Sequence, residues 1–96
     1  MNKDQQSKLE QEVRKSEEAR QLLDNKLLKE SFINLKNTYQ KSLFQTGVNE
    51  HEAREKLWLA YNIVEKVESN LAEIVNTGKL ASKQLQDYKN QIKSKL

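Results

Sequence analysis

The feature that most constrains this sequence is its near lack of residues that interrupt a helix. The 96 residues include no proline and only two glycines, Gly47 and Gly78. A β-sandwich or β-barrel needs a turn about every 8–12 residues, and such turns rely heavily on glycine and proline. Two glycines are too few for that architecture. The sequence therefore predicts an all-α protein.

Apolar residues recur at helical spacing through the first half of the chain. Between Ala19 and Phe44 they follow one another three or four positions apart, which is the period of one helix face and not of a strand. No glycine or proline separates these two residues, so we expect one continuous helix. Residues 1–18 are almost wholly polar, and they are predicted to form a helical but loosely held N-terminal segment.

A turn is expected at residues 45–49. Gly47 suits the left-handed conformation that ends many helices. Asn49 is a favoured N-cap residue, and Glu52 stands three positions later, where it would complete a capping box. A short turn makes two helices antiparallel neighbours. Residues 19–78 are therefore predicted to form an extended, coiled-coil-like antiparallel helical hairpin.

The second helix of this hairpin has the most regular pattern. Its apolar residues alternate between steps of three and four, as in a heptad seam: Leu57, Ala60, Val64, Val67, Leu71 and Ile74. A turn centred near Val48 places opposite one another residues whose numbers add to about 96. The expected pairs are Phe32 with Val64, Leu35 with Tyr61, Tyr39 with Leu57 and, toward the chain ends, Leu9 with Tyr88.

Gly78 interrupts the seam and either breaks the helix or bends it slightly, since glycine costs about 1 kcal/mol relative to alanine inside a helix. Residues 79–96 resume the helical period and are predicted to form a basic amphipathic helix. They carry five lysines against one acid, Asp87, whereas residues 1–78 hold 12 basic and 13 acidic side chains.

The lysines of this end are the candidate nucleic-acid contacts: Lys79, Lys83, Lys89, Lys93 and Lys95. Lysine contacts to phosphate depend on charge and salt and not on base sequence, so the expected partner is DNA bound non-specifically. The other interpretation is a solvated basic helix end, which the helix dipole favours. Both interpretations stay open.

Several large apolar residues fall outside the predicted seam. Two helices bury only one stripe each, and monomers seldom expose a large apolar patch. The sequence therefore predicts self-association, either as a dimeric four-helix bundle or as a ring of hairpins. The candidate interface residues are Leu23, Leu27, Ile33, Phe44, Trp58, Ile63 and Val75.

The sequence is poor in groups that carry out catalysis. It has no cysteine and a single histidine, His51, so it lacks most of the residues that form a nucleophile–base pair or a metal site. We expect no enzyme activity, no catalytic residues, no metal and no cofactor. No apolar run approaches the roughly 18–20 residues that span a bilayer, so we expect no membrane partner.

Three stretches resemble a group of short helical proteins of tailed bacteriophages. They are residues 19–25 (ARQLLDN), 53–58 (AREKLW) and 77–81 (TGKLA). The resemblance implies an oligomeric phage assembly protein. The role we associate with it is the small terminase subunit, a ring-forming protein that recognises viral DNA for packaging. It also implies a large phage protein as partner and a location in the bacterial cytoplasm or the virion.

The resemblance is incomplete at the N-terminus. Small terminases usually carry an N-terminal helix-turn-helix domain, and residues 1–18 are too short and too polar to form one. The alternative function is a helical protein–protein interaction module, an adaptor or inhibitor of a host or viral protein that binds no nucleic acid.

Overall fold

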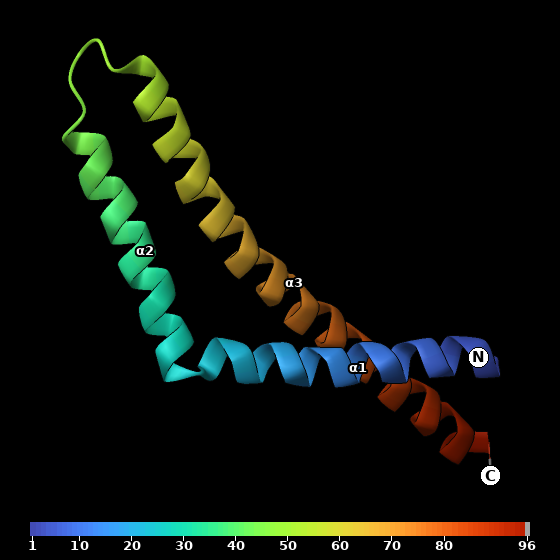
Figure 1. Ribbon diagram of the computed structural model, residues 1–96. Coiled ribbons are helices and arrows are strands. Elements are labelled where there is room, and N and C mark those ends of the chain that lie inside the picture. Colours follow the sequence, from blue (N-terminus) through green and yellow to red (C-terminus); the bar gives the residue numbers. More distant parts are fainter. Residues whose placement is uncertain (96) are drawn as a thin grey trace. The chain divides into compact units, whose positions relative to one another are not determined.

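The computed structural model describes the backbone of residues 1–95 and the side chains of residues 1–94 (Figure 1). Helix α1 spans Lys3–Asp24, α2 spans Lys26–Phe44 and α3 spans His51–Lys95. No strand occurs in this described part of the chain. The predicted all-α class with a helical hairpin is confirmed.

The continuous helix expected between Ala19 and Phe44 is wrong, because the chain leaves the helix at Asn25. Asn25 has φ −68° and ψ 119°, so only ψ departs from helical values. Its side-chain Oδ1 accepts a hydrogen bond from the Leu28 N–H at 2.9 Å, and its carbonyl accepts one from the Lys29 N–H at 3.0 Å. Asparagine is among the best N-cap residues, so α2 begins with a capped end.

The turn lies where the sequence predicts it, but its chemistry differs. Gly47 is not left-handed, since no residue of the described chain has a positive φ. The end of α2 is closed instead by Thr46, whose hydroxyl donates to the Leu43 carbonyl at 2.7 Å and whose N–H donates to the same carbonyl at 3.2 Å. The Thr46 hydroxyl therefore caps the end of α2, a role that the sequence assigned to a left-handed Gly47.

The start of α3 also differs from the expected capping box. The helix begins at His51, and the carbonyl of Glu50, not of Asn49, accepts the first helical bond, from the Arg54 N–H at 3.1 Å. Asn49 lies inside the turn. Glu52 pairs along the helix with Lys56, at 3.3 Å between Oε1 and Nζ. The turn therefore runs one residue longer than predicted, over residues 45–50.

Two compact units make up the chain. Unit 1 consists of Met1–Leu22 with Leu71–Leu96, and unit 2 is Leu23–Asn70. Because α3 is a single helix of 45 residues, it contributes its first part to unit 2 and its second part to unit 1. Gly78 lies within α3 and does not break it.

Unit 1 is built on a close crossing of α1 with the second part of α3 (Figure 1). The buried residues there are small: Ala19 is 3% exposed, Ala81 is 1% exposed, and Gly78 is buried. A Cβ added to Gly78 would overlap the side chain of Ser16 and lie 3.0 Å from the Glu12 carbonyl oxygen. The glycine that the sequence marks as a possible break therefore lies where the two helices approach closely.

Farther along the same crossing, Leu9 and Tyr88 line one shallow hollow between the two helices. The sequence pairs these two residues, and the structure places both at this hollow.

Unit 2 is the antiparallel hairpin of α2 and the first part of α3. One contact across the hairpin joins residues that the sequence does not pair: Tyr61, expected opposite Leu35, accepts a hydrogen bond from Gln40 Nε2 at 3.3 Å. Gln40 lies more than one helical turn closer to the loop than Leu35, which is 43% exposed. The facing sides of the two helices are only half-buried. None of the large side chains in the described chain is fully buried.

Candidate interaction surfaces

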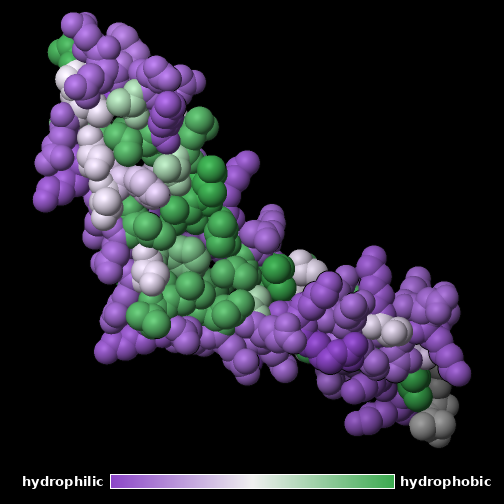
Figure 2. All heavy atoms as spheres, in the orientation of Figure 1, coloured by the Kyte–Doolittle hydropathy of each residue, from purple (hydrophilic) through white to green (hydrophobic). Residues whose placement is uncertain are grey.

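Unit 2 carries a broad exposed apolar surface. Figure 2 shows apolar side chains gathered over this unit, whereas polar side chains dominate around the chain termini. Phe44 is 91% exposed and Leu27 is 73% exposed. We call the following residues the apolar surface: Leu27, Ile33, Leu35, Phe44, Val48, Trp58, Leu59, Ile63 and Val67.

Most of the interface residues chosen from the sequence lie on this surface. Those exposed are Leu27, Ile33, Phe44, Trp58 and Ile63. Leu23 and Val75 are half-buried instead. The sequence assigned Leu35 and Val67 to the inner seam, but both are exposed. Leu59 and Val48 were missed because neither fits the heptad pattern.

An aromatic cluster covers one side of the hairpin. The rings of Trp58 and Tyr61 stack with centroids 6.5 Å apart and an angle of 15° between their planes. Together with Gln40, Leu43 and Phe44 they line an open hollow of about 330 Å³. A hydrogen bond with Glu65 and the loss of solvent around the ring raise the pKa of the Tyr61 phenol.

One ion pair bridges the two helices on this same side. Lys36 Nζ lies 2.8 Å from Glu68 Oε1, and the two side chains are 28% and 31% exposed. Oε1 itself is out of contact with solvent, so Lys36 is the group that compensates its charge. The hydrogen bond with Glu68 raises the pKa of Lys36, against a smaller opposing effect of desolvation.

Arg54 ties the turn together. Its guanidinium donates from Nη1 to the Gly47 carbonyl at 3.0 Å and from Nη2 to the Val48 carbonyl at 3.1 Å. Nη2 also lies 2.8 Å from His51 Nδ1. Arginine can only donate, so Nδ1 is the acceptor in this contact. The single histidine is therefore part of the turn structure.

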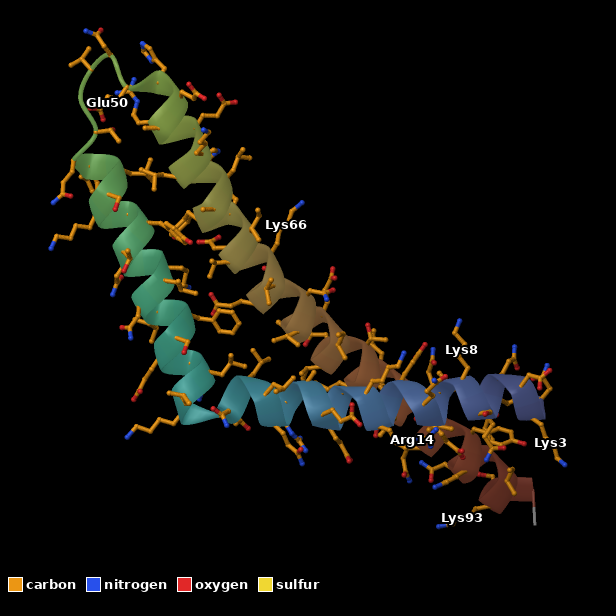
Figure 3. All side chains as sticks on the ribbon, viewed as in Figure 1. Lys3, Lys8, Arg14, Glu50, Lys66 and Lys93 are labelled. Carbon is orange, nitrogen blue, oxygen red and sulfur yellow. The ribbon has the colours of Figure 1, made fainter. Side chains whose placement is uncertain are left out.

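The candidate nucleic-acid contacts form a stripe on α3. Lys79, Lys83, Lys89 and Lys93 are all exposed, and helical spacing places the four within about 120° of arc. Figure 3 shows Lys93 projecting outward from the helix. The side chain of the fifth residue, Lys95, lies outside the described residues. We call the four described lysines the basic stripe.

The two units differ in net charge. Unit 2 holds seven basic and seven acidic side chains, so the net charge of +3 belongs entirely to unit 1. Among the described residues, no three His, Cys, Asp or Glu side chains come together as metal ligands would. Within the same part of the chain, no helix combines the length and apolar character needed to cross a bilayer.

No protein-family model matches this chain, and no curated protein or solved structure matches it either. The resemblance to short tailed-phage proteins therefore stays a prediction from the sequence.

Proposed function

We propose that this chain is a non-enzymatic helical assembly protein that works by self-association through the apolar surface of unit 2. The observation that carries the proposal is the exposure of that surface. A single chain buries none of its large side chains fully within the described residues, while Phe44, Leu27 and Ile63 are each more than half exposed.

The size of the surface supports a protein partner. Nine large side chains are exposed there, by roughly half to nine-tenths of their surface. A fully exposed side chain of this size has a surface on the order of 150 Å², so the exposed apolar area is on the order of 800 Å² in total. A stable interface buries about 800 Å² per partner. The largest apolar patch on a typical monomer is about 300–600 Å². Helical spacing sets these side chains on more than one side of the hairpin, so the area supports contacts on several sides and is not a single interface.

The charge of unit 2 supports a second copy as that partner. Seven basic and seven acidic side chains cancel, so two copies of this unit do not repel each other. In the phage setting that the sequence suggests, such an assembly acts in the bacterial cytoplasm or within the virion, together with a larger phage protein. That setting rests on the resemblance alone.

The test combines two substitutions on the apolar surface with a matched control. Leu27→Lys with Ile63→Lys should lower the molar mass measured by light scattering to that of a monomer, while circular dichroism still reports helix. Asn37→Lys with Ser69→Lys adds the same charge at exposed polar positions of the same helices and should leave the mass unchanged. A wild-type protein that is monomeric at high micromolar concentration would contradict the proposal.

The basic stripe favours a second candidate function, non-specific DNA contact. Four exposed lysines share one side of α3, and unit 1 carries the whole net charge. Binding of this kind falls steeply with salt, with a slope near 0.9 per phosphate neutralised. The assembly then presents several basic stripes to one DNA molecule, as a packaging component of the small terminase type would.

Replacing the four lysines of the stripe by glutamine should weaken binding to all DNA sequences alike and flatten the salt dependence. The matched control replaces four exposed lysines of unit 2 by glutamine, namely Lys26, Lys41, Lys56 and Lys66. It removes the same charge and should weaken binding far less. If the wild-type protein binds no DNA even at low salt, the function is the protein–protein interaction module instead.

A further inference from the structure

The partly buried residues of α1 and of α2 do not lie on one continuous stripe. Within each helix they recur about three or four positions apart, as residues on one side of a helix do. From Leu23, the last of them in α1, to Leu28, the first in α2, the step is five. At about 100° per residue, a step of five turns the stripe by about 140° around a helix. If α1 and α2 were one helix, their buried sides would therefore point in different directions.

Leu27 shows the same change of side. It stands four positions after Leu23 and would continue the buried stripe of α1 in an uninterrupted helix. In the structure Leu27 is 73% exposed, and its neighbour Leu28 is half-buried instead. The side on which α2 packs is therefore not the continuation of the side on which α1 packs.

Helix α3, in contrast, keeps one seam through both units. The buried and half-buried residues of this seam follow one another three or four positions apart: Leu57, Tyr61, Val64, Glu68, Leu71, Ile74, Gly78, Ala81, Leu85 and Tyr88. Within unit 2, α2 contacts the seam at Tyr61 and Glu68. Within unit 1, α1 meets it at Gly78. A single helix in place of α1 and α2 could not present the observed buried sides to both parts of this seam.

Asn25 supplies the change of side. Its ψ of 119° takes one residue out of the helix, while its φ of −68° stays in the helical range. Its Oδ1 accepts the Leu28 N–H at 2.9 Å and so caps α2. No glycine or proline lies between residues 3 and 44. The capping side chain of Asn25 is therefore the feature of this stretch that favours an interruption.

We propose that the interruption at Asn25 sets the rotation of α1 about its own axis, so that the side carrying Ser16 and Ala19 docks on α3 at Gly78. When residue 25 is helical, that side turns away from the seam and α1 is released. The cap at Asn25 and the docking of α1 are thus coupled, although Gly78 is 53 residues away in the chain. This inference is independent of self-association and of DNA contact.

The first test removes the cap. Asn25→Ala deletes the accepting oxygen and introduces a strong helix former. Carbon chemical shifts in NMR spectra should become helical at residue 25, and amides of residues 12–19 should lose protection from hydrogen exchange by about tenfold or more. Amides in the hairpin of unit 2 should keep their protection, which shows that the chain is still folded. Asn37→Ala makes the same change at an exposed position inside α2 and should alter neither measurement.

The second test separates rotation from capping. Two alanines inserted after position 25 of the Asn25→Ala variant lengthen the step from Leu23 to Leu28 from five to seven. Seven residues are about two helical turns, so the two buried stripes return to within about 20° of each other. The cap is still missing in this variant, yet protection of residues 12–19 should recover to within about threefold of the wild-type value.

Three results would overturn the inference. The first is full protection of α1 in Asn25→Ala, whether residue 25 becomes helical or stays extended. The second is a loss of protection that the two inserted alanines do not reverse, because a lost cap alone would then explain it. The third is an equal loss in the hairpin of unit 2, which would show that Asn25 stabilises the whole chain and does not specifically control α1.

Discussion

Units 1 and 2 pack helices in opposite ways. In unit 1, α1 and α3 approach until Ser16 touches the backbone at Gly78, and the residues buried there are alanines and a glycine. In unit 2, α2 and α3 are separated by leucine, valine and aromatic side chains, none of them fully buried. A pair of helices can enclose a methyl group, but it encloses only one side of a leucine or a tryptophan. Small side chains are thus enclosed within one chain, whereas large ones stay partly exposed.

The largest expected effect breaks the close crossing of unit 1. Gly78→Leu forces a side chain into the space held by Ser16 and the Glu12 carbonyl, so it should destabilise the docking of α1 by about 3 kcal/mol. Hydrogen exchange should show α1 losing protection while the hairpin of unit 2 keeps its own.

The other glycine supplies the control for this substitution. A Cβ at Gly47 meets only the Glu50 side chain, at 3.7 Å, and φ there is not positive. Gly47→Ala should therefore change stability by less than about 0.5 kcal/mol. Equal effects at the two glycines would contradict the close crossing.

A smaller effect is expected at the turn of unit 2. Arg54→Ala removes the two hydrogen bonds to the Gly47 and Val48 carbonyls and should lower the free energy of unfolding by about 1–2 kcal/mol, measured by urea titration. Lys56→Ala removes only an exposed pair within one helix and should cost a few tenths of a kcal/mol. If Lys56→Ala costs as much as Arg54→Ala, the guanidinium does not hold the turn.

The smallest effect concerns the ion pair that bridges the hairpin. Lys36→Met leaves Glu68 Oε1 without its compensating charge and should cost about 1 kcal/mol at neutral pH. The pKa of Lys36 is raised above its ordinary 10.5 in the folded protein, so this contribution is complete below pH 10.5 and is lost as the pH rises through the raised pKa. Urea titrations of wild type and variant should therefore converge in alkaline solution. A difference that does not depend on pH would exclude the ion pair as its cause.

The sequence predicts the helices and the turn because both depend on local properties. These are apolar residues spaced three or four positions apart and the near absence of glycine and proline. It does not predict the interruption at Asn25, since the apolar period runs through Leu23, Leu27 and Leu28 without a gap. Asn25 could have predicted this helix start, because asparagine is a strong N-cap residue. Asparagine also occurs inside helices, so the residue alone does not mark a boundary.

Gly78 shows a different limit of sequence interpretation. A glycine inside a helical pattern is read as a weak point, because its cost in helix propensity is local and known. In the structure Gly78 allows α1 to pack closely on α3. This depends on Ser16, which is 62 residues away in the chain and occupies the space that a Cβ would fill. The contact between Gln40 and Tyr61 has the same origin, since it depends on the reach of two long side chains from different helices.

The candidate surfaces follow the same division. The exposure of Phe44, Trp58 and Ile63 could be predicted, because they lie outside any seam that two helices can bury. The exposure of Leu35 and Val67 could not, because both fit the helical period that predicts the seam. The basic stripe was predictable as a charge excess, and helical spacing alone places its lysines on one side.

We expect unit 1 to be complete within one chain and unit 2 to be completed by a second copy. Residue-resolved hydrogen exchange, measured from low to high micromolar protein, distinguishes the two units. Amides of α2 and of the first part of α3 should gain protection as the concentration rises, while amides around Ala19 and Ala81 should keep the same protection throughout. Protection that is independent of concentration in both units would show that unit 2 gains nothing from a second copy.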